Sequence, residues 1–480
     1  MSTDPISATF AFVSHDFPVS ETLAAFMAGQ WAPTPLPDLA VVPAATWTGR
    51  RRVALSERFP GERLVIPAGL EKPRSNDEYF RYRAHSAFAH LTGSQAFEGV
   101  LVLEPTGDTH EAILYVHPRS PRDTGEAFRD RRLGEMWIGR KPTLAENAVL
   151  YGIACEDLAR LGGKLAGNRI QTRTLRGVDP RIDALVVGNH QDDAEFIAYL
   201  SALRLVKDAW EVAELQQAVD ATVAGFGDVA RAIPGAVGKP RGERRVEAAF
   251  NSRARLEGND LGYQTIAAAG AHACVLHWNA NTGELRDGEL LLLDAGVEGD
   301  NLYTADITRT LPISGTFTPL QRDLYNLVLA AQTAGISALR PGAKFRDFHF
   351  AGMRVIATGL HDMGILAMSV DEAMAPENGH YRRYTLCGSG HMLGLDVHDC
   401  AQALADEYVD GVLAVGNVLT VEPGLYLQPD DLTLPTELRG IGIRIEDDLV
   451  ITESGARLMS AALPRDPDAI EAWMAEQAEN

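Results

Sequence analysis

The chain has 480 residues, 46% of them hydrophobic and 23% charged; this composition is ordinary for globular proteins, and the length predicts two to three domains. The formal net charge of −21 repels phosphate backbones and anionic lipids, so we expect no nucleic acid and no membrane among its partners. Four cysteines without a CxxC pair make no disulfide framework, and residues 1–18 lack a secretory signal, so we expect a cytoplasmic protein.

Residues 1–195 are predicted to form an N-terminal domain that begins with an arm over residues 1–45. The arm contains one amphipathic stretch and then four closely spaced prolines, a pattern typical of a linker. Beyond the arm, strand-like and helix-like runs alternate, which favours an α/β arrangement. The expected strands cover residues 63–67, 99–104 and 111–116, and the expected helices cover residues 76–89 and 144–161.

Residues 196–480 are predicted to form the second, larger domain. A polar stretch at 188–193 and a long helical pattern from 193 to about 233 place the boundary near residue 195. Further along, Thr318-Pro319-Leu320-Gln321 is a capping box with proline at the first helical position, and Pro341-Gly342 follows. We therefore expect one well-defined helix between these two signals.

Two aspartates lie where apolar strand-like runs end or are interrupted. Asp294 closes the run ELLLLD, and Asp306 lies within LYTADITRT. Gly296 and Gly299 lie between the two runs. We therefore expect a hairpin that brings both carboxylates close together.

A histidine and two glutamates follow in similar settings. His391 belongs to the segment GHMLGLDVHD, and Glu422 ends the strand-like run NVLTVE. In the run IGIRIEDDLVIT, alternation places Arg444 and Glu446 on the face opposite to the isoleucines. Charged side chains thus recur at the ends and on single faces of otherwise apolar strands.

A buried acid is costly unless it is paired or binds a cation, and a single one is often a satisfied core residue. Four carboxylates and an imidazole are harder to explain in this way. If they converge, they bring four negative charges, which two divalent cations would cancel. Oxygen ligands with one nitrogen favour Mn²⁺, with Co²⁺ or Zn²⁺ as substitutes. The lack of thiolate ligands argues against a structural zinc site.

The segments DAG, DITRT, GHMLGLDVHD, TVEPGLY and GIRIEDD, in this order, resemble the metallopeptidase family with the pita-bread fold. Within that family they are most similar to the aminopeptidase P (Xaa-Pro aminopeptidase) branch. LVIPAG, RSND and HLTG resemble the N-terminal domain that accompanies this branch. The resemblance implies an α+β protein, with curved antiparallel sheets covered by helices in the C-terminal domain and a smaller α/β N-terminal domain.

The resemblance also implies roles for individual residues. Asp294, Asp306, His391, Glu422 and Glu446 would bind two metal ions, with Asp306 and Glu446 as bridges. His277 would help to bind the substrate, His398 would contact the proline carbonyl, Arg444 would hold a ligand carboxylate, and Tyr263 would lie near the metals. Glu422 would also serve as proton shuttle in metal-assisted hydrolysis of peptides with penultimate proline. His277 and His398 also have simpler interpretations, as a satisfied strand histidine and a polar residue after a turn.

Two departures and three alternatives remain. Cys387 stands where many relatives carry a histidine, and the twelve positions from Asp294 to Asp306 are one more than the commoner spacing, which we assign to a longer turn at residues 298–301. An Xaa-Pro dipeptidase is the nearest alternative, although the short spacing of 24 positions between Glu422 and Glu446 favours the aminopeptidase. Creatinase-like and non-catalytic relatives lose ligand residues that are intact here.

The family resemblance further implies that the protein forms a homodimer or homotetramer.

Overall fold

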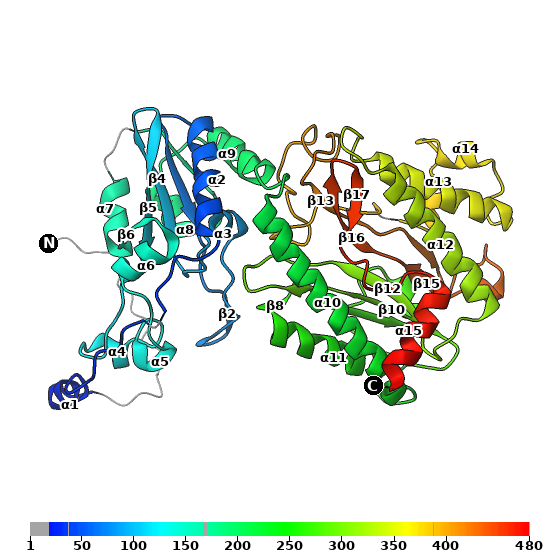
Figure 1. Ribbon diagram of the computed structural model, residues 1–480, viewed down its shortest axis with the longest axis horizontal. Helices are drawn as coiled ribbons and strands as arrows, with labels where there is room; N and C mark the ends of the chain where they lie inside the picture. Colours follow the sequence, from blue (N-terminus) through cyan, green and yellow to red (C-terminus); the bar gives the residue numbers. More distant parts are fainter. Residues whose placement is uncertain (1–18, 37, 167–169, 387, 480) are drawn as a thin grey trace.

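The computed structural model describes residues 19–36, 38–166, 170–386 and 388–479. Cys387, which we noted as a departure from the family pattern, and residues 1–18 of the arm therefore lie outside the described residues. Figure 1 shows two halves, with the N-terminal half on the left and the larger C-terminal half on the right. In the described ranges, no helix combines the length and apolarity of a membrane span.

The N-terminal half is built on one five-stranded mixed sheet with the order β6-β5-β4-β1-β7. β4 pairs antiparallel with both β1 and β5, whereas the two outer strands pair in parallel. The strands are β1 (Arg63–Pro67), β4 (Val100–Thr106), β5 (Thr109–Val116), β6 (Ala154–Asp157) and β7 (Thr172–Thr174), with a separate hairpin of β2 (Pro73–Ser75) and β3 (Glu78–Tyr79). The three strands expected from the sequence are confirmed.

Helices cover both faces of this sheet, because β1 and the first four residues of β4 are buried and present apolar side chains to both sides. One face packs against α2, α3 and α9, and the other against α7 and α8. The helices are α1 (Glu21–Met27), α2 (Ala45–Arg58), α3 (Ser86–Thr92), α4 (Glu126–Arg129), α5 (Glu135–Ile138), α6 (Leu144–Tyr151), α7 (Leu161–Leu165), α8 (Pro180–Leu185) and α9 (His190–Ala202). The expected α/β character is confirmed.

Three helix predictions need correction. The helix expected over 76–89 is wrong before residue 86, because Asn76 adopts a left-handed conformation in the turn between β2 and β3. The helix expected over 144–161 ends at Tyr151, where Gly152 forms a left-handed cap and the chain continues into β6. The long pattern from 193 to 233 is two helices, since α9 ends at Ala202 and a capping box starts α10 at Asp208.

The predicted boundary between residues 195 and 196 falls inside α9. Phe196 and Leu200 of this helix pack into the core of the N-terminal half. The packing therefore changes from one core to the other in the short link between α9 and α10, at residues 203–208.

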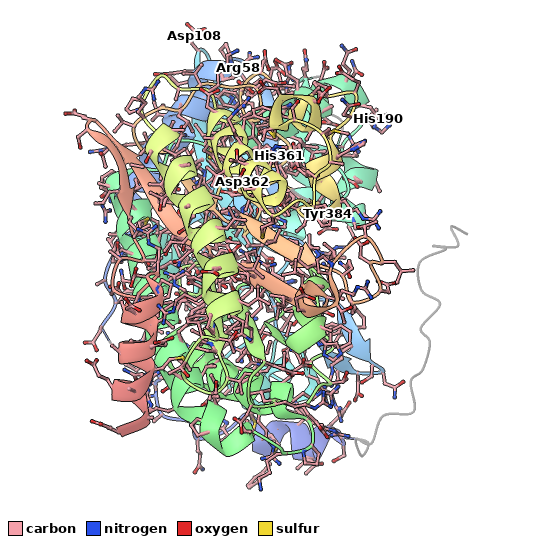
Figure 2. The ribbon with its side chains drawn as sticks, turned by 90° about the vertical axis from the view of Figure 1, so that its right-hand side faces the viewer. Arg58, Asp108, His190, His361, Asp362 and Tyr384 are labelled. Carbon is pink, nitrogen blue, oxygen red and sulfur yellow. The ribbon has the colours of Figure 1, made fainter. Side chains whose placement is uncertain are left out.

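The C-terminal half consists of small antiparallel sheets enclosed by long helices, as the pita-bread fold requires. Its strands are β8 (Asp260–Leu261), β9 (Ile266–Ala269), β10 (Leu290–Ala295), β11 (Val297–Glu298), β12 (Ile307–Pro312), β13 (Val418–Val421), β14 (Gly424–Leu427), β15 (Ile441–Arg444), β16 (Asp447–Thr452) and β17 (Gly455–Leu458). Its helices are α10 (Ala209–Ala236), α11 (Gly242–Glu257), α12 (Pro319–Ala338), α13 (Asp347–Asp362), α14 (Val370–Met374) and α15 (Pro467–Glu479). Figure 2 looks onto this half and shows α12 crossing in front of the strands, with His361 and Asp362 at the end of α13.

The sequence signals in this half have clear outcomes. α12 starts with the expected capping box and proline, and it ends at Ala338, shortly before the expected stop. The hairpin of Asp294 and Asp306 is formed by β10 and β12, which pair antiparallel. The single strand expected over 441–452 is wrong, because the chain bends at residues 445–446: β15 pairs with β14, and β16 pairs with β13. Arg444 and Glu446, at this interruption, both line one cavity.

Candidate metal centre

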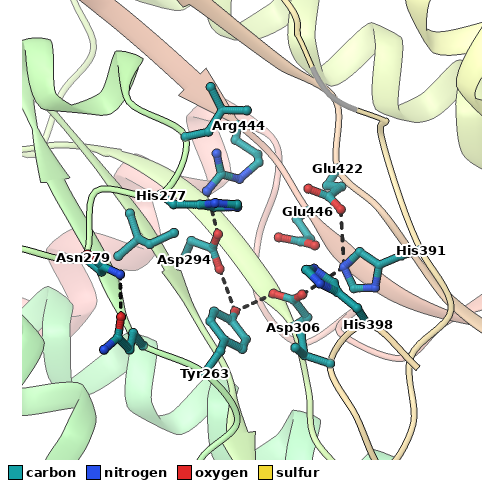
Figure 3. Close-up of a pocket in the computed structure, with 14 residues that line it drawn as sticks. Tyr263, His277, Asn279, Asp294, Asp306, His391, His398, Glu422, Arg444 and Glu446 are labelled. Carbon is teal, nitrogen blue, oxygen red and sulfur yellow. Dashed lines mark hydrogen bonds and ion pairs between the residues drawn. The ribbon is translucent and has the colours of Figure 1, made fainter. Parts of the chain in front are cut away.

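A cavity of about 270 Å³ lies between the strand hairpins of the C-terminal half (Figure 3). It brings together all nine side chains for which the sequence predicted a role. These are Tyr263, His277, Asp294, Asp306, His391, His398, Glu422, Arg444 and Glu446. Their assigned roles stay predictions, but their convergence is a property of the fold.

The β10–β12 hairpin supplies the two aspartates. Asp294 is the register partner of Thr308, and Asp306 directly precedes β12. A side chain at Gly296 would place its Cβ 1.7 Å from the carbonyl oxygen of Ala305, so only glycine permits this close approach of the two chains. The hairpin can therefore close tightly behind the two carboxylates.

His391 and Glu422 come from neighbouring segments that are joined by hydrogen bonds. The backbone N–H of His391 donates to Thr420 Oγ1 at 3.1 Å, and the backbone N–H of Glu422 donates to the carbonyl of Ser389 at 2.9 Å. As a result, His391 Nε2 lies 3.2 Å from Asp306 Oδ2 and 3.4 Å from Glu422 Oε1.

Arg444 is the last residue of β15, and Glu446 lies in the bend that leads into β16. The hydroxyl of Thr308 donates to Glu446 Oε2 at 2.7 Å and accepts from Arg444 Nε at 3.1 Å. Arg444 also donates to Asp294 Oδ2 at 2.5 Å and to the hydroxyl of Tyr426 at 2.9 Å. The guanidinium thus fixes one oxygen of the aspartate at the wall of the cavity.

Tyr263 bridges the two aspartates. Its hydroxyl lies 2.6 Å from Asp294 Oδ1 and also contacts Asp306 Oδ1. Burial and the charges of both aspartates raise the pKa of Tyr263 well above its ordinary value, so the phenol keeps the proton that it donates.

The crowded carboxylates resist full ionisation in the absence of cations. Burial raises the pKa of Asp294, although Arg444 opposes the rise, and it raises the pKa of Glu446 well above its ordinary value with the help of Asp306. Burial also raises the pKa of Glu422 to about 7 against the opposing charge of His391. For His391, burial lowers the pKa, but Asp306 and Glu422 outweigh it and raise the pKa to about 9.

These side chains fit a divalent cation. Asp306, His391 and Glu446 each offer a ligand atom, and these atoms lie within 4.8 Å of one another. Glu446 Oε1 is buried and has no hydrogen-bond partner among the described residues, which is costly for a carboxylate oxygen unless a cation takes that place. Carboxylate oxygens with one imidazole nitrogen form the donor set that Mn²⁺ and similar ions accept.

Two predicted residues lie at the rim rather than among the acids. His277 and His398 are exposed, and the ring of His398 lies 4.4 Å from that of His391, centroid to centroid. Sequence reasoning missed five further residues that line the cavity. These are Gln264, Ile266, Leu276, Asn279 and Val397, and their only sequence signal was their closeness to residues already singled out.

Asp448 was also missed, although it belongs to the segment GIRIEDD. Its Oδ2 accepts from the backbone N–H of Asp306 at 3.0 Å, and its Oδ1 is buried without a hydrogen-bond partner in the described ranges. Burial and the nearby Asp306 raise the pKa of Asp448 well above its ordinary value. This side chain supports Asp306 from behind.

The chain is similar to known proteins over nearly its whole length. Residues 213–453 match the model of metallopeptidase family M24, and residues 48–170 match that of the aminopeptidase P N-terminal domain. Xaa-Pro aminopeptidase 1 of Streptomyces coelicolor is 53% identical over 459 residues, covering 95% of this chain and 92% of that protein. Xaa-Pro aminopeptidase of Escherichia coli is 35% identical over 442 residues, covering 88% and 96%. The solved structure of Escherichia coli aminopeptidase P with the inhibitor Pro-Leu has a TM-score of 0.80 at 31% identity, covering 92% of this chain and all of that one.

Proposed function

The chain belongs to metallopeptidase family M24, in its aminopeptidase P branch, and is a metal-dependent Xaa-Pro aminopeptidase; we propose that two divalent cations bind in the acidic cavity and serve this hydrolysis. The observation that carries the proposal is the convergence of four carboxylates and one imidazole on a single cavity, where Glu446 Oε1 is buried and finds no hydrogen-bond partner in the part of the chain that the structure describes. The relatives reported above are Xaa-Pro aminopeptidases, which favours this activity over that of an Xaa-Pro dipeptidase or of a non-catalytic relative.

Asp294, Asp306, His391, Glu422 and Glu446 hold the cations in this proposal. Asp306 and Glu446 would be the two shared ligands, as the family resemblance implies, and both belong to the group whose ligand atoms lie within 4.8 Å of one another. Bound there, two divalent cations would lower the pKa of a water molecule and polarise the scissile carbonyl. Mn²⁺ is our choice of metal, because the donor set is rich in oxygen.

Glu422 is the proton shuttle. Its carboxylate faces the cavity between His391 and the hydroxyl of Thr420, which lies 3.3 Å from Glu422 Oε1. From there it takes a proton from the attacking water and delivers it to the leaving proline nitrogen. Arg444 and Tyr263 hold Asp294 in one orientation, and Tyr263 also holds Asp306.

His277 and His398 bind the substrate at the rim. An imidazole N–H at each position can donate to a carbonyl oxygen as negative charge develops on it. Proline has no backbone N–H to offer, so its ring must be recognised by shape. Ile266, Leu276 and Val397 provide apolar surface on the cavity wall for this purpose.

Two statements about the whole protein stay predictions. The family resemblance implies a homodimer or homotetramer, and the cysteine usage implies a cytoplasmic location. Sedimentation at several protein concentrations measures the first, and fractionation of cells that produce the protein measures the second.

Asp306→Asn tests the metal centre, with Asp300→Asn as a matched control. Asp300 lies exposed at the tip of the same hairpin, so its variant changes the same charge away from the cavity. We expect Asp306→Asn to lose both bound metal and release of the first residue from an Xaa-Pro-Xaa peptide, with an unchanged circular dichroism spectrum. Full activity of this variant in metal-buffered solution would contradict the assignment. Release from Xaa-Pro dipeptides alone would instead identify a dipeptidase.

A further inference from the structure

The loop over residues 270–283 is the first part of the connection from β9 to β10, and it carries His277 to the rim of the cavity (Figure 3). The His277 side chain is exposed and makes no hydrogen bond or ion pair with any described residue. Its own contacts therefore do not hold it in place. The backbone of the loop must do so.

One buried carboxylate organises this loop from behind. Glu243, at the start of α11, is completely buried. Its Oε1 lies 2.9 Å from the backbone nitrogen of Ala269 and 2.7 Å from His272 Nδ1. Its Oε2 lies 2.9 Å from Trp278 Nε1 and 2.5 Å from the backbone nitrogen of Gly283. An ionised carboxylate offers only lone pairs, so all four nitrogens are donors.

Two of the four donors lie at the ends of the loop, and the other two, on His272 and Trp278, lie within it. Ala269 precedes the loop and Gly283 closes it, and the Gly283 carbonyl in turn accepts from the backbone N–H of Glu243 at 3.1 Å. The rings of His272 and Trp278 stack with centroids 3.9 Å apart. Trp278 directly follows His277, so Glu243 holds the neighbour of the rim histidine.

We propose that Glu243 is a positioning residue for catalysis, which acts by fixing this loop so that His277 faces the substrate. The proposal rests on the role of His277 in the proposed function. Packing alone does not explain Glu243, because an apolar side chain fills such a position without the cost of burying a charge. Its two oxygens instead match two pairs of donors that define the path of the loop.

Glu243→Gln tests the proposal with little change in volume. A carboxamide has one acceptor oxygen, so its NH₂ group must face at least one of the backbone or indole N–H donors. We expect kcat for an Xaa-Pro-Xaa peptide to fall about 10- to 100-fold, since small displacements of a substrate-binding group are costly. Bound metal is expected to stay at the wild-type level, because none of the proposed ligands lies on the loop. Glu247→Gln is the matched control: Glu247 lies on the same helix, its side chain makes no hydrogen bond or ion pair with any described residue, and we expect the variant to retain wild-type activity.

A double variant separates positioning from a general structural role. If Glu243 acts through His277, then Glu243→Gln slows His277→Ala little further, whereas independent effects multiply. Multiplying effects, or full activity of Glu243→Gln, overturn the proposal. Full activity of His277→Ala instead refutes the role of His277 in the proposed function. If Glu243→Gln does not fold, Trp278→Phe, which removes a single donor, replaces it in the same cycle with the same two outcomes.

Discussion

Asp399 follows the rim histidine His398 and forms a buried ion-pair cluster with Arg204 and Lys207. The contribution of this cluster to the stability of the fold can be reasoned from its geometry. Its carboxylate accepts from Arg204 Nε at 2.9 Å and from Lys207 Nζ at 3.1 Å, and the lysine side chain is fully buried. Burial alone would raise the pKa of Asp399, but the charges of Lys207 and Arg204 outweigh it and hold the pKa below its ordinary value. The carboxylate is thus the counter-ion of two buried cations.

Asp399→Asn leaves the positively charged side chains of Arg204 and Lys207 without this counter-ion. Removing one partner of a buried ion pair costs about 3–5 kcal/mol. For a cooperative unit of a few hundred residues, that loss lowers the melting temperature by roughly 6–10 °C. The double variant Asp399→Asn with Lys207→Met removes one charge of each sign, so we expect it to melt above the single Asp399→Asn variant.

The dependence on pH has a definite sign. Because the pKa of Asp399 is lower in the folded protein than in the unfolded chain, its stabilising contribution is complete above the unfolded value of about 3.9. It is lost as the pH falls through the folded value. The difference in melting temperature between wild type and Asp399→Asn should therefore be constant from neutral pH to about pH 5 and shrink below pH 4.

Thermal unfolding followed by circular dichroism, at fixed metal concentration and at a series of pH values, measures all of these quantities. Glu407→Gln, which changes an exposed charge further along the same segment, is the control. If Asp399→Asn melts together with the wild type at neutral pH, the buried cluster does not stabilise the fold. If the double variant is the least stable of the set, the pairing argument is wrong.

Three further predictions concern the cavity. Arg444→Lys keeps the positive charge but loses the planar guanidinium group that donates to Asp294 and its neighbours. We therefore expect a titration of activity with metal to show metal affinity or activity reduced about 10- to 100-fold, and an unchanged titration curve contradicts this. Thr308→Val leaves Glu446 without its hydroxyl donor, and we expect urea denaturation of the metal-free protein to show a loss of about 1–3 kcal/mol, whereas equal stability refutes the importance of this contact. Gly390→Ala places a Cβ 2.2 Å from the carbonyl oxygen of Thr420 in β13 at a backbone φ of 155°, so we expect loss of peptide hydrolysis; wild-type kinetics would show that the segment carrying His391 tolerates displacement.

Much of the site was predictable from the sequence because its signals are local. An aspartate that closes an apolar run, two glycines between two strands, or a threonine three residues before a glutamine each determine the conformation of a few neighbouring residues. The β10–β12 hairpin and the start of α12 follow from such patterns. Alternation predicted one face for Arg444 and Glu446, and both line the cavity, although the strand that it assumed ends at Arg444. The family resemblance supplied the roles that local patterns cannot supply.

Only the tertiary structure decided which distant groups meet. Arg444 and Asp294 are 150 positions apart and yet lie in hydrogen-bond contact, and Glu243 accepts from donors up to 40 positions away. Helix periodicity predicts which face of α11 is buried, but it does not predict that a carboxylate there has four partners. Contacts of this kind depend on how separate elements pack, and sequence spacing carries no record of that packing. The sequence by itself thus determined the strands, turns and caps that carry the charged groups, while packing decided their partners.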